Sequence, residues 1–222
     1  RGDSMKRLVT AVFALVLAAT VPALAQVPAA RDYVQGRTSA ADVAERCGVR
    51  YANHYGRNAV LFPVIDQAGD LVAINDRAID GSSAKSLTTG PRSLGVFATT
   101  GALDAARVVI VESPLDALAV AACGFDAIAL CGTSWPSWLP EVLEGKDVLL
   151  GFDNDAAGEA ATAKLASELL GRAPVQRLKP SRKDWAEIAE SDGLDVLRAE
   201  LAAALFDASQ DECEVELEVF EC

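Results

Sequence analysis

The amino-acid sequence predicts an α/β fold in which a parallel sheet is flanked by helices and preceded by a small β-rich subdomain. Two apolar runs, Val108–Val111 and Val148–Phe152, do not alternate with polar residues and are rich in Val and Leu, as is typical of buried parallel strands. Further strands and helices are expected to alternate along this half of the chain, which predicts right-handed crossovers between parallel strands. With 222 residues, 51% of them hydrophobic, the chain can bury one sizeable core.

We expect four parts along the chain: an apolar N-terminal helix or signal-like segment over 1–30, an N-terminal α+β subdomain over 31–104, the parallel-sheet domain over 105–206 and an acidic tail over 207–222. The tail holds seven acidic residues and no base, and without it the net charge falls from −12 to −5. This negative balance argues against a protein that coats nucleic acid through charge alone. Five cysteines without a CxxC pair and a single histidine, His54, argue against zinc and multi-histidine sites.

In the N-terminal subdomain, residues 27–37 are expected to be a connector, followed by a short helix that ends at Cys47. The runs Ala59–Ile65 and Leu71–Ala78 are predicted to be strands of a hairpin, because the residues between them, 66–70, are rich in turn formers.

In the parallel-sheet domain, strands and helices are predicted to alternate. The expected strands are Val108–Val111, Ala127–Leu130, Val148–Phe152 and Val175–Leu178. The expected helices are Leu115–Cys123, Trp135–Leu143, Ala156–Leu170, Trp185–Glu190 and Leu194–Leu205.

Carboxylates follow two of these strands at the point where each strand ends. Glu112 follows the first strand, and Asp153 and Asp155 follow the third. Ligands of open α/β sheets bind beyond the carboxyl ends of the strands, so these three side chains are expected to converge on one crevice. Carboxylates this close repel one another, and a hard cation such as Mg²⁺ relieves the repulsion. The pattern therefore predicts a Mg²⁺ site for phosphoryl chemistry on a nucleotide or nucleic acid.

The same residues resemble the Toprim domain, which is shared by topoisomerases, bacterial-type primases and some nucleases. Its pattern is a Glu that ends one strand and an Asp-x-Asp that ends a later strand, matched here by Glu112 and by Asp153-Asn154-Asp155. The sequence FDNDAAGEAA over 152–161, the intervening CGTS turn and Lys183-Asp184-Trp185 look most like the DnaG-type primase branch, including phage and plasmid forms. The resemblance covers roughly residues 58–190.

The resemblance implies roles for a set of acidic residues. The catalytic residues it implies are Glu112, Asp153 and Asp155, and the metal ligands are the same three with Asp116 and Asp184. It makes Glu112 either a metal ligand or the general acid/base at the reacting phosphate. Asp116 could equally be a first-turn acid that interacts with the helix dipole, and Asp184 a helix N-cap. The sequence departs from the primase pattern at Ser113, where primases usually have Gly.

The resemblance also implies contacts with a nucleotide or nucleic acid. The implied binding residues are Arg77, Lys85, Gly132, Thr133 and Lys183. Cations near a metal–triphosphate would neutralise phosphate charge, and a tight turn could offer backbone N–H groups to it. The alternatives are ordinary surface cations and a plain turn.

The activity implied is Mg²⁺-dependent synthesis of RNA primers on a DNA template, with Mn²⁺ as an alternative ion. Nucleoside triphosphates and DNA are the expected substrates, a replicative helicase is a candidate partner, and a phage or mobile element is a candidate origin. Neither a zinc-binding module nor a GxxxxGK[ST] motif is present in the sequence. The alternatives are a Toprim metal-dependent nuclease and a non-catalytic module that binds replication proteins.

A cytoplasmic location is expected for such an enzyme, but residues 5–25 have the pattern of a secretory signal peptide. The basic pair Lys6 and Arg7 precedes the apolar run Leu8–Val21, and Ala23-Leu24-Ala25 is a small-residue cleavage pattern. The alternative, which the downstream motifs favour, is an Ala/Leu-rich helix that packs on the core or joins an upstream domain. The apolar run is shorter than the ~20 residues that a bilayer span needs.

Overall fold

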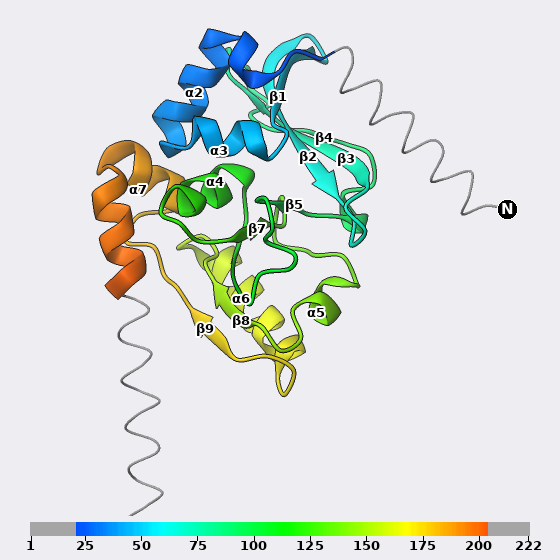
Figure 1. Ribbon diagram of the computed structural model, residues 1–222, viewed down its shortest axis with the longest axis vertical. Helices are drawn as coiled ribbons and strands as arrows, with labels where there is room; N and C mark the ends of the chain where they lie inside the picture. Colours follow the sequence, from blue (N-terminus) through cyan, green and yellow to red (C-terminus); the bar gives the residue numbers. More distant parts are fainter. Residues whose placement is uncertain (1–20, 204–222) are drawn as a thin grey trace, which may run out of the picture.

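The computed structural model describes residues 21–203 and contains two β-sheets (Figure 1). The first sheet is antiparallel and has the order β1 (Arg50–His54), β2 (Arg57–Ile65), β3 (Leu71–Ala78), β4 (Thr88–Thr89). The second has the order β5 (Phe97–Ala98), β7 (Ala127–Ala129), β6 (Arg107–Val111), β8 (Asp147–Leu150), β9 (Val175–Arg177). In it β7, β6, β8 and β9 are parallel, and β5 is an antiparallel edge strand. The predicted α/β class, with a parallel sheet after a β-rich part, is confirmed.

Helices cover both faces of the second sheet. Their bounds are α2 (Pro28–Thr38), α3 (Ala41–Arg46), α4 (Pro114–Ala122), α5 (Leu139–Val142), α6 (Ala156–Leu169) and α7 (Trp185–Ser191), with 3-10 turns η1 (Leu24–Gln26) and η2 (Arg92–Leu94). Residues 194–203 are also helical.

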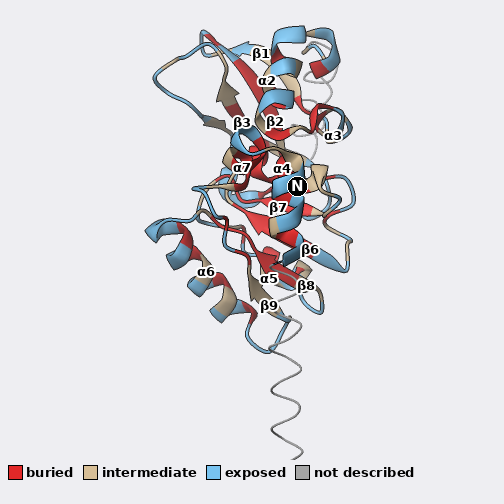
Figure 2. Cartoon of the chain, turned by 90° about the vertical axis from the view of Figure 1, so that its left-hand side faces the viewer, coloured by how far each residue is buried: buried red, intermediate tan, exposed pale blue. Residues whose placement is uncertain are grey.

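Two cores form because successive side chains of a strand point to opposite faces of the sheet. Val109 and Val111 of β6 belong to the core that α2, α4 and α7 share. Val108 and Ile110 belong to the core beneath α5 and α6. Figure 2 shows the buried residues following the central strands and α4, whereas much of α6 is exposed.

Close contact between α6 and the end of β8 requires a glycine. A Cβ atom added to Gly158 would lie 2.1 Å from the carbonyl oxygen of Asp153. Any other residue would push the first turn of α6 away from Asp153. Gly158 therefore fixes the position of an expected site residue.

Three expectations about local structure need correction. Residues 27–37 are not a connector but most of helix α2, which starts at Pro28 because proline suits a first helical turn. Strand β1 was not predicted. Helix α5 begins at Leu139 and not at Trp135, because Pro136 disfavours helical backbone in the residue before it.

Two predicted parts at the ends of the chain lie outside the described residues. They are residues 5–20 of the signal-like stretch and the whole acidic tail over 207–222. Of the remaining part, Leu24 is fully buried in the core and Ala23 pairs with Arg50. Within residues 21–203, no helix is long and apolar enough to cross a membrane. The four-part division of the chain stays a prediction.

Candidate active site

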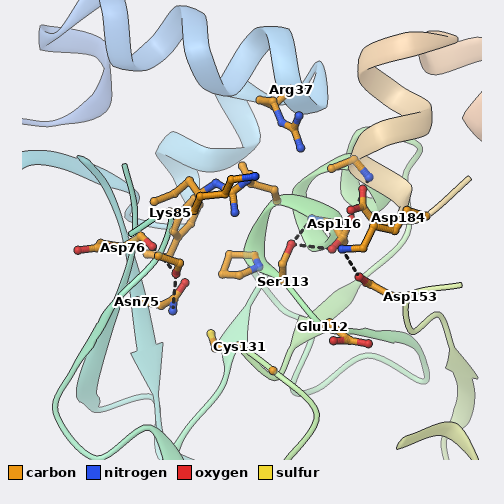
Figure 3. Close-up of a pocket in the computed structure, with 18 residues that line it drawn as sticks. Arg37, Asn75, Asp76, Lys85, Glu112, Ser113, Asp116, Cys131, Asp153 and Asp184 are labelled. Atoms are coloured by element: carbon orange, nitrogen blue, oxygen red, sulfur yellow. Dashed lines mark hydrogen bonds and ion pairs between the residues drawn. The ribbon is translucent and has the colours of Figure 1, made fainter. Parts of the chain in front are cut away.

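A cavity of about 310 Å³ lies between the first sheet and the carboxyl ends of the parallel strands (Figure 3). Its lining includes eight residues expected from the sequence: Arg77, Lys85, Glu112, Asp116, Gly132, Asp153, Lys183 and Asp184. Asp155 and Thr133 are not among its lining residues. The structure thus brings together side chains that are more than 100 positions apart in the sequence.

Glu112, directly after β6, has only part of its carboxylate compensated by neighbouring groups. Its Oε1 atom is buried and has no hydrogen-bond partner among the described residues. Burial and, next, the charge of Asp153 raise the pKa of Glu112 to about 7. A carboxyl group with this pKa can gain or lose a proton near neutral pH, and its free oxygen can accept a ligand.

Asp153 lies beside Glu112, and Lys183 balances part of its charge. The Nζ atom of Lys183 lies 3.2 Å from Oδ2 of Asp153. Burial raises the pKa of Asp153, although the hydrogen bond and charge of Lys183 act in the opposite direction. The backbone N–H of Asn154 donates to the carbonyl oxygen of Lys183 (2.7 Å), which holds the Lys183–Asp184 segment against the end of β8.

Asp116 and Asp184 both make hydrogen bonds within the fold, in line with the structural roles that the sequence offered as alternatives to metal binding. Asp116 is only 2% exposed; its Oδ1 accepts a hydrogen bond from the N–H of Ala186 (2.9 Å), and its Oδ2 accepts one from the hydroxyl of Ser113 (2.6 Å). Burial and the charge of Asp184 raise the pKa of Asp116. Asp184 is the N-cap of α7 and accepts from the N–H of Glu187 (2.7 Å). Asp116 therefore joins α4 to α7 while its carboxylate lines the cavity.

Asp155 is the N-cap of α6. Its Oδ1 accepts hydrogen bonds from the N–H groups of Ala157 (3.0 Å) and Gly158 (2.9 Å). It is exposed beside the cavity, and its charge contributes to the raised pKa of both Glu112 and Asp153. The structure thus gives Asp155 a capping role and places it within electrostatic reach of the other two acids.

The acids form a donor set suited to a hard divalent cation, but their present spacing is not that of a closed metal site. Among the described residues, no group of three or more His, Cys, Asp and Glu side chains is placed to hold a metal ion. However, the donors here are carboxylate oxygens, which Mg²⁺ prefers. The buried, unpartnered oxygen of Glu112 and its raised pKa fit a site that gains a cation.

Cationic side chains line the opposite side of the cavity. Lys85 is exposed, and Arg77 donates through Nε to the hydroxyl of Tyr33 (3.3 Å). Arg37, at the end of α2, forms an ion pair with Glu190. Its Nε atom is buried without a hydrogen-bond partner in the described part of the chain. Sequence reasoning missed Arg37 because α2 was not predicted, although the four-residue spacing of the buried positions Ala30, Val34 and Thr38 was a usable signal.

In the turn after β7, one of the N–H groups expected to bind phosphate already has a partner. The N–H of Gly132 donates to the carbonyl oxygen of Glu112 (3.0 Å). Arg92 donates to the carbonyl oxygen of Cys131 (2.7 Å), and a Cβ atom at Gly132 would lie 2.8 Å from that guanidinium. The turn is thus a structural support for Glu112. Thr133 is exposed outside the cavity lining.

Arg177 fixes the end of β8 and was not predicted. Its Nη1 donates to the carbonyl oxygens of Leu150 (2.9 Å) and Phe152 (3.0 Å). The indole N–H of Trp185 donates to the carbonyl oxygen of Gly151 (2.8 Å), and the Trp185 side chain is buried. Arg177 and Trp185 thus donate hydrogen bonds to the backbone carbonyl groups that directly precede Asp153.

The raised pKa of Glu112 predicts a pH-dependent penalty on stability. The folded state keeps the proton of Glu112 up to about pH 7, whereas the unfolded state loses it near pH 4.5. Stability is therefore lost as pH rises through this window, and Glu112→Gln should remove the loss. In EDTA, urea unfolding should show the variant gaining free energy of unfolding over the unaltered chain at pH 8 but not at pH 4. An equal difference at both pH values would contradict a raised pKa.

Comparisons with known proteins agree with the observed fold. Residues 109–189 match a Toprim-like family model. A DNA primase of Clostridium acetobutylicum is 28% identical over 152 residues, which are 62% of this chain. The chain spans a quarter of the length of this curated relative.

Solved primase structures share the fold. A DnaG primase catalytic domain bound to single-stranded DNA has a TM-score of 0.68 at 18% identity, covering 96% of this chain and 85% of that chain. The zinc-binding and RNA polymerase domains of the Aquifex aeolicus primase have a TM-score of 0.64 at 17% identity, covering 82% of this chain and 57% of that chain. Residues 109–189 thus match a Toprim-like domain, and the chain shares its fold with these primase structures.

Proposed function

We propose that this protein is a primase-type nucleotidyltransferase that synthesises RNA primers on a DNA template. The observation that carries the proposal is a cavity in which an acidic wall faces a cationic wall. The acidic wall includes Glu112 and Asp153, and the cationic wall comprises Arg37, Arg77 and Lys85. Phosphoryl transfer is mostly a matter of positioning and neutralising charged phosphates, which this pairing of walls suits.

The acidic wall would hold the divalent cation, Mg²⁺ or alternatively Mn²⁺. Glu112 and Asp153 would be its principal ligands, with Asp155 and Asp184, whose charges act on Asp153, as further candidates. When bound, the ion would neutralise charge that develops on the transferred phosphate. Asp116, whose oxygens are both hydrogen-bonded, would instead hold α4 and α7 in place.

Two further roles belong to side chains of the cavity. Glu112, whose Oε1 atom has no hydrogen-bond partner among the described residues, would accept the proton of the attacking 3′-hydroxyl group. Arg37, Arg77 and Lys85 would bind phosphates of the nucleoside triphosphate or of the template strand. Lys183, now paired with Asp153, would be released toward phosphate when a metal ion takes over that carboxylate.

The partners follow from the same reasoning. One structural neighbour is a primase catalytic domain bound to single-stranded DNA, and others are phage T7 primase domains bound to an RNA/DNA hybrid. For this chain we propose DNA and nucleoside triphosphates as substrates, a replicative helicase as a partner and the cytoplasm as the location.

The activity test is primer synthesis by the full chain. The reaction would contain single-stranded DNA, labelled ribonucleotides and Mg²⁺ or Mn²⁺. Asp153→Asn should lower the rate at least about 100-fold, because a ligand to the charge-stabilising cation is lost. The matched control is Asp147→Asn at the other end of β8, where an exposed ion pair with Arg107 is worth only about 0–1 kcal/mol. The control should stay within about twofold of the unaltered chain.

The alternatives are separate outcomes of this assay. Metal-dependent loss of the DNA without RNA product would identify a nuclease, in which Glu112 would protonate the leaving oxygen. Neither product, with or without a helicase present, would contradict catalysis and favour a module that binds replication proteins.

The capping role of Asp155 predicts that its stability and metal functions can be separated. Asp155→Ser keeps an oxygen that can cap α6 but removes the charge, whereas Asp155→Ala removes both. Urea unfolding should show a loss of about 1 kcal/mol for the Ala variant and less than about 0.5 kcal/mol for the Ser variant.

Calorimetric titration with Mn²⁺ should show weaker binding in both Asp155 variants. Unchanged Mn²⁺ affinity in both would restrict Asp155 to capping and remove it from the proposed ligands.

A further inference from the structure

Lys85 lies on a segment that contains little regular secondary structure. This segment, residues 84–89, follows a Gly-Ser-Ser stretch and ends in the two-residue strand β4. Its backbone runs beside β3: the N–H of Ala78 donates to the carbonyl oxygen of Lys85 (2.9 Å), and the N–H of Asp76 donates to that of Leu87 (2.8 Å). The position of Lys85 at the cavity thus depends on how firmly this segment is held.

A buried carboxylate lies directly beneath the segment. The side chain of Asp76 on β3 is 0% exposed. Its Oδ1 accepts a hydrogen bond from the N–H of Leu87 (2.7 Å). Its Oδ2 lies 2.6 Å from Nη2 of Arg57 and 2.6 Å from Nδ1 of His54.

Both partners of Asp76 also reach the segment themselves. Arg57 donates a hydrogen bond to the carbonyl oxygen of Ala84. Nε2 of His54 lies 3.3 Å from the hydroxyl oxygen of Thr89. The network therefore holds residues 84–89 near both ends, through Ala84 and Thr89, and in the middle, through Leu87.

This arrangement differs from the core that surrounds it. The same region contains the small apolar cluster of Ala59, Leu61 and Ile74, which could have been extended by apolar side chains. Burying a carboxylate costs free energy unless it is fully paired, and an apolar replacement is often as stable. An apolar group, however, cannot form directional hydrogen bonds to the backbone of a surface segment.

We infer that Asp76, with Arg57 and His54, is a positioning centre that fixes residues 84–89 and thereby holds Lys85 at the cavity, ready to bind phosphate. This inference rests on the proposed function for the role of Lys85, but not for the fixing of the segment. Preorganisation of this kind lowers the ordering cost that a flexible lysine segment would otherwise incur on binding.

The first arm of the test is a double-mutant cycle on the full chain. Binding of ATP and of a labelled twelve-residue oligo-dT would be measured for Asp76→Asn, Lys85→Ala and the double variant; the two probes distinguish a nucleotide phosphate from a template phosphate. Each single variant should weaken binding of the same probe about fivefold or more, and the double variant should match Lys85→Ala within about twofold. Additive losses would overturn the inference, because Asp76 would then act independently of Lys85.

The second arm is hydrogen exchange, which needs no activity. In Asp76→Asn the amides of residues 76, 78 and 87 should exchange at least about tenfold faster, while that of Gly151, which follows β8 and bonds to Ile110, keeps its rate. Unchanged exchange in the segment, or an equal increase at Gly151, would overturn the inference. If neither probe bound the unaltered chain, the proposed function would fail, and exchange would still decide whether the segment is anchored.

Two further sets of variants keep the test decisive. Asp66→Asn is the matched control, because Asp66 Oδ1 accepts hydrogen bonds from Ala68 and Asp70 in the β2–β3 turn. It should change exchange only in that turn and leave binding unchanged. If Asp76→Asn does not fold, Arg57→Lys should recover part of the binding and exchange protection that Arg57→Ala loses. Equal defects in both Arg57 variants would contradict a directional role for the guanidinium group.

Discussion

The burial of two carboxylates, Glu112 and Asp153, at the carboxyl ends of β6 and β8 is the constraint on which the site depends. Burial raises the pKa of both Glu112 and Asp153, so each is held in surroundings that disfavour its charged form. Lys183 offsets part of this cost at Asp153, whereas one oxygen of Glu112 has no partner among residues 21–203. A site that a cation or a proton would stabilise is thus built into the fold.

The surrounding structure holds these acids in place without using their charge. Gly158 allows α6 to approach Asp153, and Arg177 and Trp185 satisfy the carbonyl groups at the end of β8. Asp116 ties α4 to α7. On the other side of the cavity the antiparallel sheet and α2 contribute the cations, so the site needs both sheets. The buried Asp76 network has a comparable function for Lys85, because it holds the backbone of residues 84–89 and does not itself bind the ligand.

The sequence was sufficient to predict elements with a strong local signal and residues that follow strand ends. Hence β6, β8 and α6 were expected close to their observed bounds, as were the positions of Glu112 and Asp153. Contacts that depend on tertiary packing were not visible. Arg37 was missed because α2 looked like a connector, Arg177 because its carbonyl partners are defined only once the sheet forms, and the engaged N–H of Gly132 because its acceptor is distant in sequence.

Location of a bound metal ion is the measurement that tests the central claim most directly. Crystals of the full chain would be soaked in Mn²⁺, and its anomalous scattering would locate the ion without reference to any activity. The account predicts a peak within about 2.0–2.3 Å of oxygens of Glu112 and Asp153, with Lys183 moved away from Asp153. A peak elsewhere, or no peak at a saturating Mn²⁺ concentration while the Lys183–Asp153 pair stays intact, would contradict it.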